Sequence, residues 1–120
     1  MRTFALTILV ACLGGCSAVN SADLFGHDEA FVVKTLGTPE NRSELTMPHP
    51  DYPWMGPTPV GLSPGESFIS LKYVFYWRDE KWYIFLASSA AYERIYGTKP
   101  STAAADCVFL VQKYPKNAVF

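Results

Sequence analysis

The hydrophobic residues of this chain fall into three patterns: one unbroken run, one helical repeat and several alternating segments. The unbroken run extends from Phe4 to Leu13. The helical repeat begins after Asp28, an acid suited to the positive end of a helix dipole, and stops at Gly37 and Pro39. Its apolar side is formed by Phe31, Val32, Thr35 and Leu36. These features predict one helix near the start of a folded domain.

Alternation is clearest from Ser67 to Trp77, which predicts a strand with two side-chain faces. One face holds Ile69, Leu71, Tyr73, Phe75 and Trp77, and the other holds Phe68, Ser70, Lys72, Val74 and Tyr76. After a turn at 78–81, the chain returns as a second strand from Trp82 to Ala87. A loop of either two or four residues places Trp77 opposite Trp82. The first face continues as Trp82, Ile84 and Leu86, so we expect it to pack on the helix.

Three shorter elements complete the predicted domain. Residues Glu40 to Thr46 suit a short edge strand, and Ser89 to Tyr96 suit a short helix with Ser89 as its N-cap. A further strand is expected from Asp106 to Val111, with Cys107, Phe109 and Val111 on one side. Residues 114–117 then suit a turn, and Val119 with Phe120 suits the stub of another strand.

A long segment from Met47 to Glu66 separates the first two strands. It holds six of the nine prolines and three glycines, so it should be an ordered loop without regular structure. The fold class expected from all these elements is α+β, with two layers. One or two helices would pack on an antiparallel sheet of three to four strands.

The apolar run at the N-terminus is too short to cross a hydrocarbon core of roughly 30 Å, and Gly14 and Gly15 interrupt it, so a cleaved export signal is expected. Leu13-Gly14-Gly15-Cys16 resembles the lipobox of bacterial lipoproteins. The resemblance implies that 1–15 is removed and that Cys16 receives acyl chains such as palmitate. Cleavage after Ala18 and an uncleaved anchor over 3–22 are the alternatives.

The same resemblance indicates the membrane in which the protein is anchored. Lipoproteins with Asp after the lipidated cysteine usually stay in the inner membrane, so Ser17 implies anchoring in the outer membrane, with the domain facing the periplasm. Two or more acyl chains hold a protein durably at a bilayer. The small, polar residues 16–25 are expected to be the lipidated tether, followed by a single domain over 26–120.

Composition narrows the functional classes. The segment 1–15 carries only Arg2, so the remaining 105 residues hold 9 basic and 11 acidic side chains and a net charge of −2. Nucleic acid binding requires a basic face and is not expected. Of the three cysteines, Cys12 leaves with the signal and Cys16 carries lipid, so Cys107 has no partner for a disulfide.

Catalytic chemistry is sparse in this sequence. His27 and His49 share no metal-ligand spacing, so no metal site is expected. Cys107 with a histidine would make a nucleophile and base, but its alternation with Phe109 and Val111 favours a buried structural thiol. There is no phosphate loop or serine-nucleophile elbow. We therefore expect a non-enzymatic protein without a cofactor.

The second face of the predicted hairpin is the best candidate for function. It joins aromatic and aliphatic side chains to nearby cations: Val74, Tyr76, Tyr83 and Phe85, with Lys72, Arg78 and Lys81 around them. Tyr76 is expected opposite Tyr83. Either the proline-rich loop or the second helix covers these rings, or they form a surface for an envelope protein partner. Stacking on the sugars of peptidoglycan is a variant of the second interpretation.

Three sequence segments carry a resemblance to a known family: "HDEAFVVKTLGTPENR", "LKYVFYW" and "DCVFLVQKYPKNAVF". Together they resemble the SmpA/OmlA-type lipoproteins, the family of the small accessory lipoprotein of the outer-membrane β-barrel assembly machinery. Leu36-Gly37-Thr38-Pro39 is the most recognisable part. The resemblance implies a binding role in envelope or β-barrel assembly. Related folds occur in secreted inhibitors of β-lactamases, so an inhibitor or sensor of an envelope enzyme is the alternative.

Overall fold

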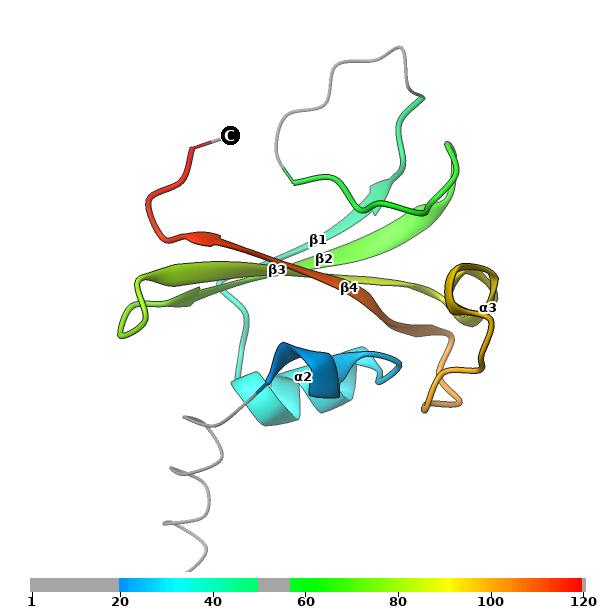
Figure 1. Ribbon diagram of the computed structural model, residues 1–120, viewed down its shortest axis with the longest axis horizontal. Helices are drawn as coiled ribbons and strands as arrows, with labels where there is room; N and C mark the ends of the chain where they lie inside the picture. Colours follow the sequence, from blue (N-terminus) through cyan, green and yellow to red (C-terminus); the bar gives the residue numbers. More distant parts are fainter. Residues whose placement is uncertain (1–19, 50–56, 120) are drawn as a thin grey trace, which may run out of the picture.

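The structure is a computed structural model that describes residues 20–49 and 57–119. Within these ranges, four antiparallel strands lie side by side in chain order (Figure 1): β1 (Asn41–Thr46), β2 (Ser67–Phe75), β3 (Glu80–Ser88) and β4 (Asp106–Pro115). A 3-10 helix, η1 (Ser21–Leu24), and two α-helices, α2 (Glu29–Leu36) and α3 (Ser89–Tyr96), complete the domain. The predicted α+β class is therefore confirmed. The predicted signal and Cys16 lie outside the described residues.

Helix α2 begins and ends where the sequence predicted. The Asp28 carboxylate accepts a hydrogen bond from the backbone N–H of Phe31 at 2.9 Å, which satisfies one of the unpaired donors of the first turn. Gly37 ends the helix with φ 89°, a conformation that costs glycine little. Between these ends, Val32 is fully buried against the sheet.

The folded domain begins earlier than expected. Residues 20–25 were predicted to be part of the tether, but Ser21–Leu24 form η1, capped by the Asn20 side chain, which accepts from the N–H of Ala22 at 3.1 Å. Leu24 is fully buried in the same cluster as Val32. Small and polar residues dominate this segment, which is typical of a tether, but Leu24 and the adjacent Phe25 attach it to the core.

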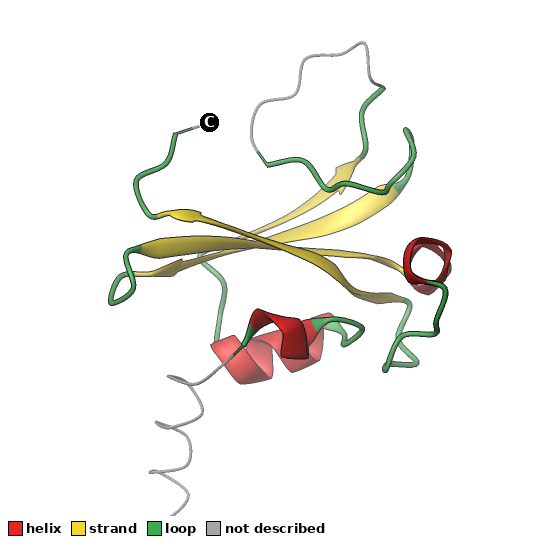
Figure 2. Ribbon diagram, in the orientation of Figure 1, coloured by secondary structure: helices red, strands yellow, loops and turns green. Residues whose placement is uncertain are grey.

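The sheet has apolar side chains on both faces. Helices η1 and α2 lie together on one side of the strands (Figure 2). On the face that α2 and η1 cover, hereafter the α2 face, the buried residues are Leu24, Val32, Leu71, Tyr73, Trp82, Ile84, Leu86 and Val108. On the other, hereafter the loop face, they are Leu62, Phe68, Phe85, Ala87, Ala91 and Phe109. Tyr73 also joins α2 to the sheet, because its hydroxyl donates to the carbonyl of Gly37 at 2.7 Å.

The loop face is covered by the described end of the proline-rich segment and by α3. Leu62 and Ala91 pack in the same cluster as Phe85. Arg94 of α3 holds the segment in place: its guanidinium donates to the Glu66 carboxylate at 2.6 Å and to the carbonyl of Gly61 at 3.0 Å. Helix α3 matches its predicted span, although its N-cap is Ser88 rather than Ser89. The covering interpretation is thus confirmed for this part of the face.

The β2–β3 hairpin has a different register from the predicted one. Tyr73 lies opposite Trp82, Lys72 opposite Tyr83 and Ser70 opposite Phe85. The predicted pairs Trp77 with Trp82, Tyr76 with Tyr83, and Val74 with Phe85 are therefore wrong. The turn takes Tyr76 to Asp79, with Asp79 in the left-handed region at φ 58°, which Asp tolerates better than most residues.

The observed register of the hairpin differs from the predicted one by an even number of residues. The partner of Trp82 changes from the predicted Trp77 to Tyr73, four positions away, so every side chain keeps its predicted face. Apolar alternation predicts which face of the sheet a side chain lies on, but it does not predict which residue of the neighbouring strand lies opposite. Here the position of the turn sets the pairing, and Trp77 lies after the last paired residue of β2.

Strand β4 also differs from the prediction. The pairing shifts between Phe85 and Leu86, so that Cys107 lies opposite Ala87 while Val111 lies opposite Ile84 on the other face. The expectation that Cys107, Phe109 and Val111 share one side is wrong, because Phe109 is the extra residue of a β-bulge. The strand also continues to Pro115, and Val119 lies in an exposed segment rather than in a strand.

Candidate functional site

The residues predicted to form a partner surface do not form one continuous patch. Phe85 is buried in the loop-face cluster, and Tyr83 is half-buried beside it. The ring of Tyr83 packs edge-on against Tyr114, with centroids 5.9 Å apart. Val74 is half-buried on the same face. The prediction that Phe85 belongs to an exposed partner surface is wrong, because Leu62 and Ala91 cover it.

Lys81 has a structural position. It is only 7% exposed, and its Nζ donates to the carbonyl of Ala118 at 2.6 Å. A buried ammonium must be hydrogen-bonded, because loss of hydration is otherwise costly. The lysine therefore fastens the C-terminal segment to β3, and it does not offer its charge to a partner as predicted.

The exposed part of the predicted set is concentrated at the turn of the β2–β3 hairpin, hereafter the hairpin tip (Tyr76 to Asp79). Tyr76 is 70% exposed and Trp77 is 64% exposed. The ring of Tyr76 lies beside the C-terminal segment, with the Nζ of Lys116 5.2 Å from its centroid. The backbone N–H of Lys116 donates to the carbonyl of Asp79 at 2.9 Å, and its Nζ lies 3.5 Å from the Asp79 carboxylate. The C-terminal segment thus braces the tip.

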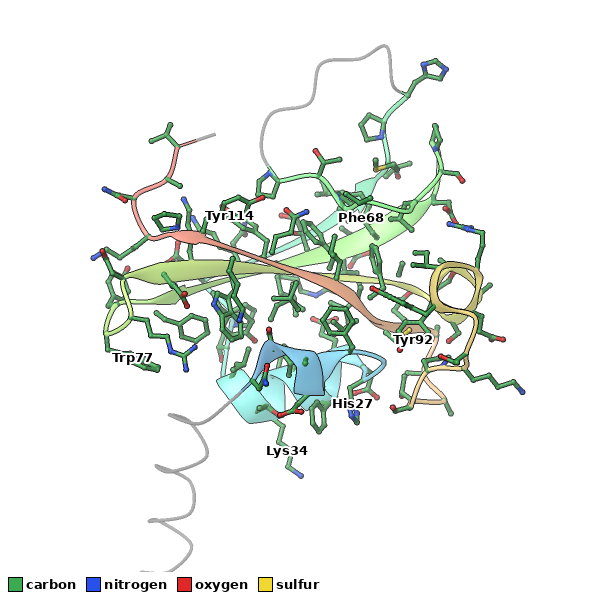
Figure 3. The ribbon with its side chains drawn as sticks, viewed as in Figure 1. His27, Lys34, Phe68, Trp77, Tyr92 and Tyr114 are labelled. Atoms are coloured by element: carbon green, nitrogen blue, oxygen red, sulfur yellow. The ribbon has the colours of Figure 1, made fainter. Side chains whose placement is uncertain are left out.

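Trp77 lies on the α2 side of the tip (Figure 3). It contacts Phe75 edge-on at a centroid distance of 6.3 Å, and Phe75 in turn contacts the buried Trp82 at 4.7 Å. Trp77 was expected in the core, and its exposure makes it a candidate functional residue that was not predicted from the sequence. The signal that could have indicated it is its position directly before Arg78-Asp79, where a turn removes the covering neighbours of a strand.

Arg78 connects the exposed tryptophan to the core. The centre of its guanidinium lies 4.5 Å from the ring centroid of Trp77 and 5.7 Å from that of Trp82, distances at which cation–π attraction is appreciable. Its Nη1 lies 3.9 Å from the Glu80 carboxylate, and the same carboxylate accepts from the indole N–H of Trp82 at 3.1 Å. On the same face, the Nζ of Lys113 lies 4.7 Å from the Trp82 centroid. The tip is therefore a supported arrangement of rings and cations.

A shallow pocket lies at the opposite end of the sheet. It has a volume of about 280 Å³ and is lined mainly by β1 and the start of β2, with Glu44, Phe68 and Asp106 among its residues. Thr46 pairs with Ser67 there, whereas the tip follows the far end of β2. The polar side chains that line it belong to Glu44, Thr46, Ser67 and Asp106.

Cys107 is fully buried opposite Ala87. Burial raises the pKa of its thiol, with the nearby Asp106 carboxylate acting in the same direction, so the thiol stays protonated at neutral pH. The predicted buried thiol is confirmed. Among residues 20–49 and 57–119, no three His, Cys, Asp or Glu side chains are grouped so that they could hold a metal ion.

None of the helices in the described ranges is long and apolar enough to cross a bilayer. No protein-family model, curated protein sequence or solved structure matches this chain.

Proposed function

We propose that this protein is a lipoprotein of the outer membrane that faces the periplasm and provides a protein-binding surface in envelope or β-barrel assembly. The sequence Leu13-Gly14-Gly15-Cys16 supports the lipid anchor, and the resemblance to the SmpA/OmlA-type lipoproteins supports the assembly role. In this proposal the protein performs no chemistry and acts by binding.

The observation that carries the proposal is the exposed Tyr76 on a braced turn. Tyrosine is favoured in protein interfaces, because a rigid ring buries much area at little cost in side-chain entropy. Tyr76 is 70% exposed, and Lys116 stands beside its ring. Contacts between Lys116 and Asp79 hold the turn, so the ring is presented without further ordering of the backbone. We define the Tyr76 surface as Tyr76 and Lys116.

The proposal is tested by placing a photo-crosslinking amino acid at position 76 of the full-length protein in living cells. Position 60 is the matched control, because Val60 is 73% exposed but lies in the loop before β2. We expect position 76 alone to yield a defined adduct with an envelope protein. A crosslinker placed on that partner protein should in turn form an adduct with the hairpin tip.

A second measurement uses the substitution Tyr76→Ala. Truncating a buried aromatic anchor typically weakens binding by about 1 kcal/mol or more, so co-purification with the identified partner should fall severalfold. A partner belonging to a membrane assembly supports the assembly role. Stoichiometric capture of one soluble envelope enzyme would instead favour the inhibitor or sensor. Equal adducts from positions 60 and 76 would contradict the Tyr76 surface.

A further inference from the structure

The side of the hairpin tip that carries Trp77 has surroundings unlike those of Tyr76. Trp77 lies on the α2 side of the sheet, 64% exposed, with the guanidinium of Arg78 over its ring. Its inner edge rests on Phe75, which rests on Trp82. The indole is thus fixed in direction and open to solvent on its outer side.

The start of the described chain lies on the same face of the sheet. Leu24 of η1 is in the buried cluster with Trp82, and Phe25 packs against that cluster. In Figure 1, η1 and α2 both lie below the sheet, and the chain enters the domain there. Any attachment that precedes Asn20 therefore approaches the domain from the α2 face.

The length of chain before Asn20 limits how far the domain can stand from a lipid anchor. Four residue steps separate Cys16 from Asn20, and a fully extended chain covers at most roughly 14 Å over four residues. Because Leu24 of η1 is fully buried in the core, the connection to the anchor cannot lengthen beyond that residue. A domain held by acyl chains on Cys16 must therefore rest its α2 side close to the bilayer.

We propose that the Trp77 side of the hairpin tip rests on the membrane surface, with the Trp77 indole in the headgroup region and the Arg78 guanidinium facing lipid phosphates. This inference rests on the proposed lipid anchor at Cys16. Tryptophan is favoured at this depth because its ring is apolar and its N–H finds a polar partner. Arginine suits phosphate because its planar fork donates two parallel hydrogen bonds. Lys113, on the same face, adds positive charge opposite anionic lipids.

This contact would give the domain a fixed orientation. The anchor supplies one attachment point and the tryptophan a second, so rotation about the tether is restricted. Tyr76, beside Lys116 of the C-terminal segment, is left for a protein partner. The two neighbouring aromatic residues of the tip would thus contact different kinds of partner.

The test uses the full-length acylated protein, purified in detergent and reconstituted into vesicles of phosphatidylethanolamine and phosphatidylglycerol with brominated acyl chains. An environment-sensitive fluorophore is attached to Trp77→Cys or, as the matched control, to Tyr76→Cys. Cys107 is fully buried, and the unsubstituted protein measures any background labelling at it. We expect bromine to quench the fluorophore at position 77 at least severalfold more strongly than at position 76.

A second measurement avoids labelling altogether. Trp77→Phe should remove most of the bromine-dependent loss of intrinsic tryptophan fluorescence while leaving the thermal midpoint unchanged. Equal quenching at positions 76 and 77, or no quenching at position 77, would overturn the membrane contact.

The mass of the mature N-terminus separates this inference from the anchor on which it rests. With Cys16 acylated and position 77 unquenched, the membrane contact fails and the anchor stands. An unacylated N-terminus would overturn both.

Discussion

At the scale of single residues, Trp77 and Trp82 differ in burial although both contact Phe75. Trp82 is 1% exposed, and its indole N–H donates to Glu80 at 3.1 Å, so both its apolar ring and its polar atom are satisfied. Trp77 is 64% exposed and has core contacts on one edge only. Both tryptophans were expected on the packed face, and only Trp82 is buried there.

We expect Trp82→Ala to lower the free energy of unfolding by about 3 to 5 kcal/mol, because it leaves a cavity on the α2 face. Trp77→Ala should cost less than about 1 kcal/mol, since an exposed ring loses few contacts. Chemical denaturation followed by circular dichroism measures both values. A loss of stability at Trp77 as large as that at Trp82 would place Trp77 back in the core.

At the scale of elements, helix α2 depends on its cap. The pKa of Asp28 is lowered from its usual value of 3.8, first by the hydrogen bond from the Phe31 N–H, then by the hydroxyl of Thr102, against the opposing effect of burial. Thr102 donates to the carboxylate at 3.0 Å and belongs to the segment between α3 and β4. One ionised carboxylate thus joins the start of α2 to a distant part of the chain.

A lowered carboxyl pKa gives stability that is present at pH values above 3.8 and is lost as the pH falls through the folded-state pKa. We therefore expect Asp28→Asn to be less stable than the unsubstituted protein at pH 6, with the difference shrinking as the pH falls below 3.8. Asp28→Ala should cost about 1 kcal/mol at neutral pH. Thermal unfolding across this pH range provides the measurement. A difference for Asp28→Asn that stays constant across this pH range would contradict the proposed linkage.

The elements that could be predicted from sequence are those with local causes. Asp28 and Gly37 bound α2, and Gly97, left-handed at φ 75°, ends α3 where expected. Pairing could not be predicted in the same way. The register of β2 with β3 depends on the turn conformation at Asp79, and the bulge at Phe109 depends on which residues the neighbouring strand presents. These are interactions between segments, and alternation within one strand does not contain them.

The same limit explains the candidate site. The face of every hairpin residue was predicted correctly, since an even shift preserves it, but which rings were exposed depended on the register. In the structure Phe85 is covered by Leu62 and Ala91, whereas Trp77 is exposed to solvent. Tyr76 was identified from sequence, whereas Trp77 needed the structure.

At the scale of the whole molecule, the proposed anchor and the compact domain are connected by very few residues. We expect Cys16→Ser to release the protein from the membrane fraction, because acylation needs the thiol and no described helix is long enough to span a bilayer. Fractionation followed by mass spectrometry of the mature N-terminus is the measurement. The isolated Cys16→Ser protein should keep the thermal midpoint of the domain.

Recovery of the mature protein with an unmodified N-terminus at residue 19 would contradict lipidation and favour ordinary cleavage after Ala18. Persistence of Cys16→Ser in the membrane fraction, with the segment before Cys16 uncleaved, would instead favour a retained anchor.

Ser88 belongs to two elements at once: it is the last residue of β3, and its hydroxyl accepts from the Ala91 N–H at 3.1 Å as the N-cap of α3. No linking residue therefore separates strand β3 from helix α3. One inserted residue at this junction would turn the helix by about 100° about its axis and carry Ala91 away from Phe85. In any lineage that retains this domain, insertions and deletions should accordingly be rare between residues 88 and 89, even where substitutions in α3 are common.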